Sequence, residues 1–303
     1  MEAARQPIAL PVLRLGRCDE LLASLPVVHE GARAVSKRTP VRTIFAGDDE
    51  SADLELPLGH VCVRSLRSPD KTTPNEDVAA ILEVDGEHLV LAVADGVGGV
   101  PGGREAAGVA ARSLADHVDG APESVELRPL VLDALDHANS ALLGLGRGSA
   151  TTVAVAAISG TRLRTYHVGD SEVAVVGQRG RIKLRVVPHS PTGFAVEAGM
   201  LDENAAVKHE ERHLLLNVVG SQEMRIEVGM PIELARRDTV MLASDGVFDN
   251  LYFDEIVKLI RCGSLRKAAD TLVARARKRM DEPRGDRPSK PDDLTFILFR
   301  RRR

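Results

Sequence analysis

Pairs of short apolar runs, each pair separated by two or three turn-forming residues, recur along the chain and most constrain its fold. Asp85-Gly86, for example, separates residues 78–84 from residues 88–94. Turns this short reverse the chain, so each pair predicts an antiparallel hairpin. Such hairpins exclude a doubly wound parallel sheet. The other pairs are residues 151–158 with 162–168 and residues 171–177 with 181–187.

The remaining segments complete this picture. Further apolar runs predict strands at residues 59–66, 239–243 and 294–299. Apolar residues at helical spacing predict helices at residues 104–118, 127–143, 253–260 and 265–280. Helices that come in pairs between runs of strands are typical of an α+β fold. We therefore predict a four-layer α-β-β-α sandwich, with two antiparallel sheets flanked by helices.

Composition narrows the class of protein. Of 303 residues, 44% are hydrophobic and 28% charged, as in soluble globular proteins. The net charge of −4 and the 3% of aromatic residues argue against a nucleic-acid partner. No window approaches eighteen uncharged apolar residues, so we expect no membrane span. Three scattered cysteines favour a reducing, cytoplasmic environment.

The N-terminal part differs from the rest. Residues 1–58 are punctuated by proline and mix short apolar runs with charge. We expect them to form an extension of unknown role, and residues 59–300 to form the folded domain.

Carboxylates stand where the predicted strands begin or end. One aspartate at such a place is usually only a turn former. Several at the same end of a sandwich would repel one another unless a cation held them together. Donors that are all oxygen favour Mg²⁺ or Mn²⁺ over zinc. The segments concerned are Asn75-Glu76-Asp77, Asp95-Gly96, Gly169-Asp170, Asp245 to Asp249, and Asp292-Asp293.

At these positions the chain resembles the metal-dependent protein serine/threonine phosphatases of the phosphatase 2C (PPM) family, in their bacterial form. The likeness covers about residues 59–300, which would then be the catalytic domain. It rests on an ordered set of segments rather than on any one of them. They are NED at 75–77, ADGVGG at 94–99, GSATTVAVAAISGTRLRTYHVGDSEVAVV at 148–176, SDGVFDNL at 244–251 and DDLT at 292–295.

The resemblance implies a role for each matching residue. Asp95 would bridge two metal ions, and the Gly96 carbonyl would bind one of them. Asp245 and Asp292 would bind the other, so that the catalytic set is Asp95, Asp245 and Asp292. The remaining implied ligands are Glu76 and Asp77, directly or through water, and Asp170 and Asp249, which with Asp245 would hold a third, looser ion.

Three positions depart from the family pattern. The arginine that binds substrate phosphate is replaced by Thr72, so the nearby cations Lys71 and Arg67 become the candidates, against a reading of both as solvated loop charges. The histidine that follows the Asp-Gly pair is replaced by Val97, which leaves the general acid unidentified. The final motif has Asp293 in place of asparagine, and Asp293 therefore competes with Asp292 for the ligand role.

The function implied is hydrolysis of phosphoserine or phosphothreonine on proteins, with two and possibly three Mg²⁺ or Mn²⁺ ions, by direct attack of a metal-bridging water. We expect a monomer that opposes a serine/threonine kinase, and a mobile flap at residues 189–217 that selects substrate. Two alternatives stay open. One is a pseudophosphatase that binds phosphoproteins or a partner without turnover, and the other is a phosphatase of small metabolites.

Overall fold

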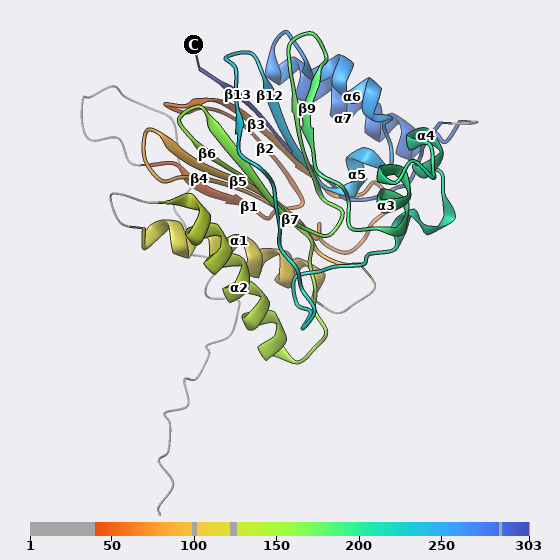
Figure 1. Ribbon diagram of the computed structural model, residues 1–303. Coiled ribbons are helices and arrows are strands. Elements are labelled where there is room, and N and C mark those ends of the chain that lie inside the picture. The colour runs from red at the N-terminus through yellow and green to blue at the C-terminus, as the bar shows by residue number, and fades with distance from the viewer. Residues whose placement is uncertain (1–39, 99–101, 122–125, 285–286, 303) are drawn as a thin grey trace, which may run out of the picture. The chain divides into compact units, whose positions relative to one another are not determined.

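The computed structural model describes residues 40–98, 102–121, 126–284 and 287–302. The chain divides into two units, Met1–Thr39 and Pro40–Arg303. The first unit, which makes up most of the predicted N-terminal extension, lies outside the described residues. Everything below concerns the second unit, drawn in colour in Figure 1.

The first sheet is antiparallel at every pairing of its described strands, and its central strands are buried on both faces. Its order is β1 (Arg42–Phe45), β4 (Asp77–Glu83), β5 (His88–Asp95), β6 (Val153–Ser159), β7 (Arg162–Val168) and β10 (Glu227–Val228), with β11 (Ile232–Glu233) also pairing β7.

The second sheet is likewise antiparallel, and β13, close to the end of the chain, runs through its interior. Its order is β2 (Asp49–Glu55), β3 (Gly59–Leu66), β13 (Leu294–Arg301), β12 (Thr239–Ala243), β8 (Glu172–Val176) and β9 (Ile182–Arg185). The predicted hairpins are confirmed as β4–β5, β6–β7 and β8–β9.

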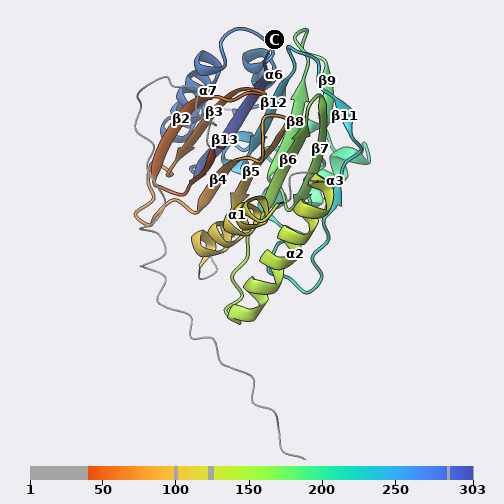
Figure 2. The same cartoon turned by 90° about the vertical axis from the view of Figure 1, so that its left-hand side faces the viewer.

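Two pairs of helices cover the outer faces of the sheets (Figures 1 and 2). The helices α1 (Gly103–Asp119) and α2 (Leu127–Leu145) pack on the first sheet, and α6 (Phe253–Ile260) and α7 (Leu265–Asp281) pack on the second. Shorter helices lie in the connections: α3 (Pro191–Glu197), α4 (Glu203–Ala206), a 3₁₀ turn η2 (Glu210–His213) and α5 (Asp245–Phe248). None of the described helices has the length and apolarity needed to cross a membrane.

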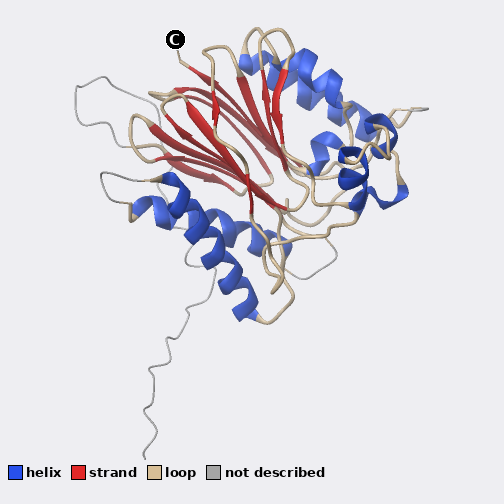
Figure 3. Cartoon of the chain, viewed as in Figure 1, coloured by secondary structure: helices blue, strands red, loops and turns tan. Residues whose placement is uncertain are grey.

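Figure 3 shows the layers as red sheets between blue helices, and three separate apolar cores fill the spaces between them. One lies between α1, α2 and the first sheet, one between the sheets, and one between the second sheet and α6, α7. Each fully buried Val, Leu or Ile side chain contributes about 1.5–3 kcal/mol. The predicted four-layer α-β-β-α sandwich is confirmed.

Residues 42–55 lie before the domain boundary predicted at residue 58, yet they form edge strands of both sheets. In β2, half-buried and exposed residues alternate along the whole sequence DESADLE. Ala52 and Leu54 face the core between the sheets, and acidic residues face solvent. This period of two is that of a strand, but only two apolar residues carry it.

Candidate metal centre

The first sheet brings two carboxylates together where a hairpin opens. Asp77 begins β4, Asp95 ends β5, and the two are direct partners in the antiparallel register. Asp77 is buried, and its Oδ2 accepts a 2.7 Å hydrogen bond from the hydroxyl of Ser244, which lies between β12 of the second sheet and α5. This hydrogen bond ties the ends of the two sheets together at the carboxylates.

The second sheet supplies two more carboxylates at the same end. Asp245 follows β12 and opens α5, and Asp292 lies just before β13. Because β12 and β13 pair antiparallel, with Ala243 opposite Phe296, the end of one strand lies beside the start of the other. Gly246 allows the close approach, since a Cβ at this position would lie 1.8 Å from the Asp293 carbonyl oxygen.

Gly96 is packed tightly against the first turn of α1. A Cβ on Gly96 would lie 2.2 Å from the backbone carbon of Gly103, so only glycine fits. Its N–H donates a 3.2 Å hydrogen bond to the Glu76 carbonyl, and it forms a β-bridge with Thr151. The backbone after Asp95 is therefore held against both of its neighbours, close to the carboxylates.

The carboxylates lie close enough together to disfavour one another's charged forms. Burial raises the pKa values of Asp77, Asp95 and Asp170 well above the usual range, and neighbouring carboxylates raise them further. Burial also raises the pKa values of Asp249 and Asp292 to about 6 each, with Asp245 as the next contributor. A half-buried cluster of oxygen donors that resists ionisation is chemically suited to hard divalent cations such as Mg²⁺ or Mn²⁺. The residues present therefore fit the ions that the sequence predicts.

Lys290 is the cation inside this cluster, and the sequence analysis did not identify it. Its Nζ lies 2.8 Å from Asp245 Oδ2, 2.9 Å from Asp249 Oδ2 and 2.9 Å from Asp292 Oδ2. These carboxylates raise the pKa of Lys290 against the opposing effect of burial. A lysine two residues before Asp292 carries no signal in the sequence that would place it there.

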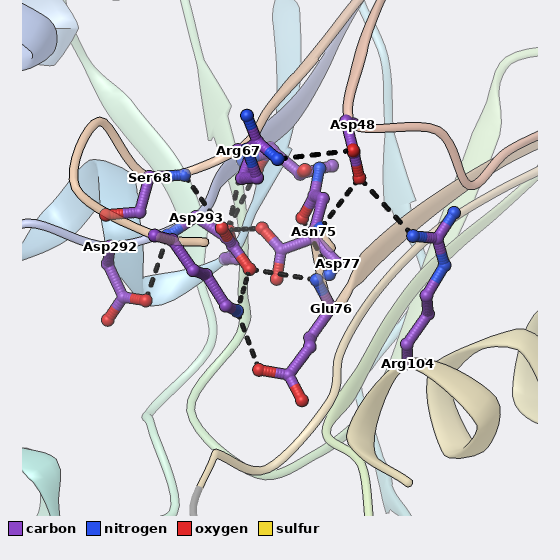
Figure 4. A network of polar contacts seen from close by, with 12 residues as sticks. Asp48, Arg67, Ser68, Asn75, Glu76, Asp77, Arg104, Asp292 and Asp293 are labelled. Carbon is purple, nitrogen blue, oxygen red and sulfur yellow. Dashed lines mark hydrogen bonds and ion pairs between the residues drawn. The ribbon is translucent and has the colours of Figure 1, made fainter. Parts of the chain in front are cut away.

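Asp293 faces Glu76 and Asp77 rather than Lys290, although it adjoins Asp292 (Figure 4). Its carboxylate accepts 2.8 Å hydrogen bonds from the backbone N–H groups of Ser68 and Glu76, and a 2.5 Å contact from Lys71 Nζ. Lys71 Nζ also lies 2.6 Å from Glu76 Oε2. Asp293 thus fixes the loop that carries Glu76, and Asp292 is the member of the pair that contacts Lys290.

Arg67 is engaged elsewhere in the same loop region. Its Nη1 lies 3.5 Å from Asp48 Oδ2, and its carbonyl accepts a hydrogen bond from Arg277. Asp48 also pairs with Arg104 and accepts the N–H of Asn75 (Figure 4). Lys71 is therefore bound to Glu76 of the site, while Arg67 is held by Asp48.

Asp170 and Asp249 lie on the side of the segment at residues 189–217. A cavity of about 200 Å³ separates this segment from the carboxylates, and both residues line it. From η2, Arg212 Nε reaches 3.6 Å from Asp249 Oδ1. The predicted flap thus borders the carboxylate cluster and places a cation against it.

Comparison with known proteins identifies the family and the fold. The protein phosphatase 2C family model matches residues 69–279. The serine/threonine phosphatase stp of Listeria welshimeri is 23% identical over 238 residues, which are 75% of this chain and 90% of that protein. The solved structure of Stp1 from Staphylococcus aureus has a TM-score of 0.69 at 20% identity, covering 90% of this chain and 99% of that one. The solved catalytic domain of the phosphatase PstP in complex with 2 manganese ions has a TM-score of 0.64 at 22% identity, covering 80% and 97%.

Proposed function

Because the chain belongs to the protein phosphatase 2C family, we propose that it is a Mg²⁺- or Mn²⁺-dependent phosphatase that hydrolyses phosphoserine and phosphothreonine on proteins. The observation that carries this proposal is the meeting of Asp77 and Asp95 from one sheet with Asp245 and Asp292 from the other. Relatives named serine/threonine phosphatases support the substrate class.

Different residues would bind the metal ions in different ways. Asp95 is suited to bridge two cations, with the Gly96 carbonyl beside it and Asp245 and Asp292 opposite. Glu76 and Asp77 would act through water or directly. When bound, such cations polarise a phosphoryl oxygen and lower the pKa of a water, which is the chemistry that direct attack on phosphorus requires.

The chain's own groups orient these ligands. Ser244 fixes one oxygen of Asp77. Lys71 and Asp293 together fix the loop and the side chain of Glu76. Lys71 is partly exposed and is our candidate for the cation that faces substrate phosphate, whereas Arg67 has a partner outside the cluster. We also propose that the enzyme is a cytoplasmic monomer that opposes a serine/threonine kinase.

The test is Mn²⁺-dependent hydrolysis of a phosphothreonine peptide. Asp95→Asn and Asp245→Asn should each lower kcat at least about a hundredfold, because each removes charge that holds the ions. Asp254→Asn is the matched control, since the exposed Asp254 pairs only with the exposed Lys258 among described residues.

The comparison substrates are p-nitrophenyl phosphate and sugar or nucleotide phosphates. Faster turnover of the small phosphates than of the peptide would favour a metabolite phosphatase. Binding of phosphopeptide without turnover of any substrate would favour a pseudophosphatase. Full activity in Asp95→Asn would show that the reaction occurs elsewhere in the molecule.

A further inference from the structure

Lys290 makes contacts that match what an ammonium group can offer. An ammonium has three donors and no acceptor. Three carboxylate oxygens, one each from Asp245, Asp249 and Asp292, lie 2.8–2.9 Å from Nζ. These are the distances of charge-assisted hydrogen bonds. The contact to Asp245 Oδ2 is a hydrogen bond, and those to Asp249 and Asp292 are ion pairs, so the side chain of Lys290 is not a stray surface charge.

The spacing of these oxygens is compatible with an ammonium. Around an octahedral Mg²⁺, ligand oxygens lie about 2.1 Å from the ion and at most about 4.2 Å from one another. Among the described residues, the only three metal-binding side chains with ligand atoms all within 4.8 Å of one another are His167, His189 and Glu227. At least two of the three oxygens around Lys290 therefore lie more than 4.8 Å apart, a separation that an ammonium 2.8–2.9 Å from each of them spans.

Asp249 is held from both sides by protein cations. Its Oδ2 faces Lys290 and has no hydrogen-bond partner beyond this ion pair among the described residues. Its Oδ1 faces Arg212 at 3.6 Å. Both oxygens of Asp249 thus face protein cations, although Asp249 also lines the cavity beside residues 189–217.

We propose that Lys290 is a built-in cation that closes the space between Asp245, Asp249 and Asp292 to a divalent ion. This inference rests on one part of the proposed function, namely that the site binds divalent cations. Lys290 uses Oδ2 of Asp245, and no hydrogen bond from the described residues reaches Oδ1 of that side chain. Asp245 therefore keeps an oxygen for the two metal ions at Asp95. Asp292 pairs with Lys290 through Oδ2, and its Oδ1 accepts the Asp293 N–H.

The experiment is calorimetric titration of Mn²⁺ into the full-length protein and into Lys290→Met, which keeps the length of the side chain and removes its charge. The variant should bind an additional Mn²⁺ ion per chain, more weakly than the others. Its melting temperature in EDTA should fall by several degrees and should recover with Mn²⁺. Lys258→Met, on the exposed face of α6, is the control and should match the wild type.

A second arm does not depend on Lys290→Met folding well. Asp249→Asn in the wild-type background should leave the Mn²⁺ stoichiometry unchanged, because Asp249 already pairs with Lys290. Combined with Lys290→Met, it should remove the additional ion. Loss of an ion in Asp249→Asn alone, or equal stoichiometry in the wild type and Lys290→Met, overturns the proposal. Phosphopeptide turnover by the wild type is measured in parallel, so that failure of the proposed activity is seen separately from these binding results.

Discussion

Single ammonium groups organise the carboxylates of this protein at two places. Lys71 joins Glu76 to Asp293, and Lys290 joins the carboxylates near α5. Removing one partner of a buried pair leaves the other desolvated and unpaired, which costs about 1–3 kcal/mol or more. The effect of substituting either lysine, on stability and on catalysis, therefore depends on whether the carboxylate that loses it finds another partner.

Lys71→Ala tests whether the cation that orders the loop also binds substrate. Asp293 is almost fully buried and would lose its only cationic partner among the described residues, so the free energy of unfolding should fall by about 1–3 kcal/mol. If the ammonium also faces substrate phosphate, KM for a phosphothreonine peptide should rise more than kcat falls. Urea unfolding and steady-state kinetics give both quantities. An unchanged KM with lowered stability would confine Lys71 to its structural contacts.

His167 should make the folded state sensitive to acid. Its ring lies in β7, stacks on His189 at 4.3 Å, and places Nε2 2.9 Å from the Val187 carbonyl. Burial lowers the pKa of His167, and His189 lowers it further, although Glu227 acts in the opposite direction. Below the unfolded pKa of about 6.5 the unfolded chain binds a proton that the folded chain resists, so stability is lost as pH falls.

The measurement is urea unfolding of the wild type and of His167→Gln from pH 7.5 to pH 5.5. The contribution of His167 to the slope approaches about 1.4 kcal/mol per pH unit at most, and the variant should lack it. His60→Gln, at an exposed position, should keep the wild-type slope. Identical slopes in the wild type and His167→Gln would mean that His167 binds its proton equally well in both states.

Elements differ in how far their sequence alone determines them. The hairpins were predictable because a two- or three-residue turn permits only one pairing of its neighbours. The strand β2 was missed because Ala52 and Leu54 are its only apolar residues, too few to reveal its inward face. Asp292 and Asp293 make different contacts because adjacent side chains point in opposite directions. Which of the two faces Lys290 depends on how the chain enters the sheet. The position of Lys290 arises where α5 meets the start of β13, a contact between distant segments that no local pattern encodes.

Gly246→Ala tests the contact between α5 and the segment before β13. The added Cβ would lie 1.8 Å from the Asp293 carbonyl oxygen, so α5 must move and carry Asp245 with it. We expect loss of at least about 2 kcal/mol of stability, as for other overpacked sites, and weaker Mn²⁺ binding by calorimetry. Gly86→Ala, where nothing lies within 4 Å of the new Cβ, is the control. Normal Mn²⁺ affinity in Gly246→Ala would show that the position of Asp245 is not critical.

At the scale of the whole folded unit, the two sheets are joined in two ways. Over most of their area an apolar core fills the space between them. At the carboxylate end the contacts are polar. Ser244 bonds to Asp77, and Asn75 Nδ2 donates a 3.0 Å hydrogen bond to Ser65 Oγ of β3. Cations bound between Asp95 and the carboxylates of the second sheet would therefore fasten one sheet to the other where the apolar core ends.

This arrangement predicts that metal ions stabilise the entire sandwich rather than one loop. At a Mn²⁺ concentration of 100 times Kd, binding adds about 2.7 kcal/mol, which raises the melting temperature of a chain this size by roughly 5–10 °C. EDTA should reverse the shift, and hydrogen exchange at the ends of both β5 and β13 should slow together when Mn²⁺ is added. Asp95→Asn, which changes a carboxylate of the first sheet only, should abolish most of this rise in melting temperature. An equal shift in this variant, or slower exchange in only one sheet, would mean that the ions bind without coupling the sheets, and the carboxylates of the two layers would then not form one centre.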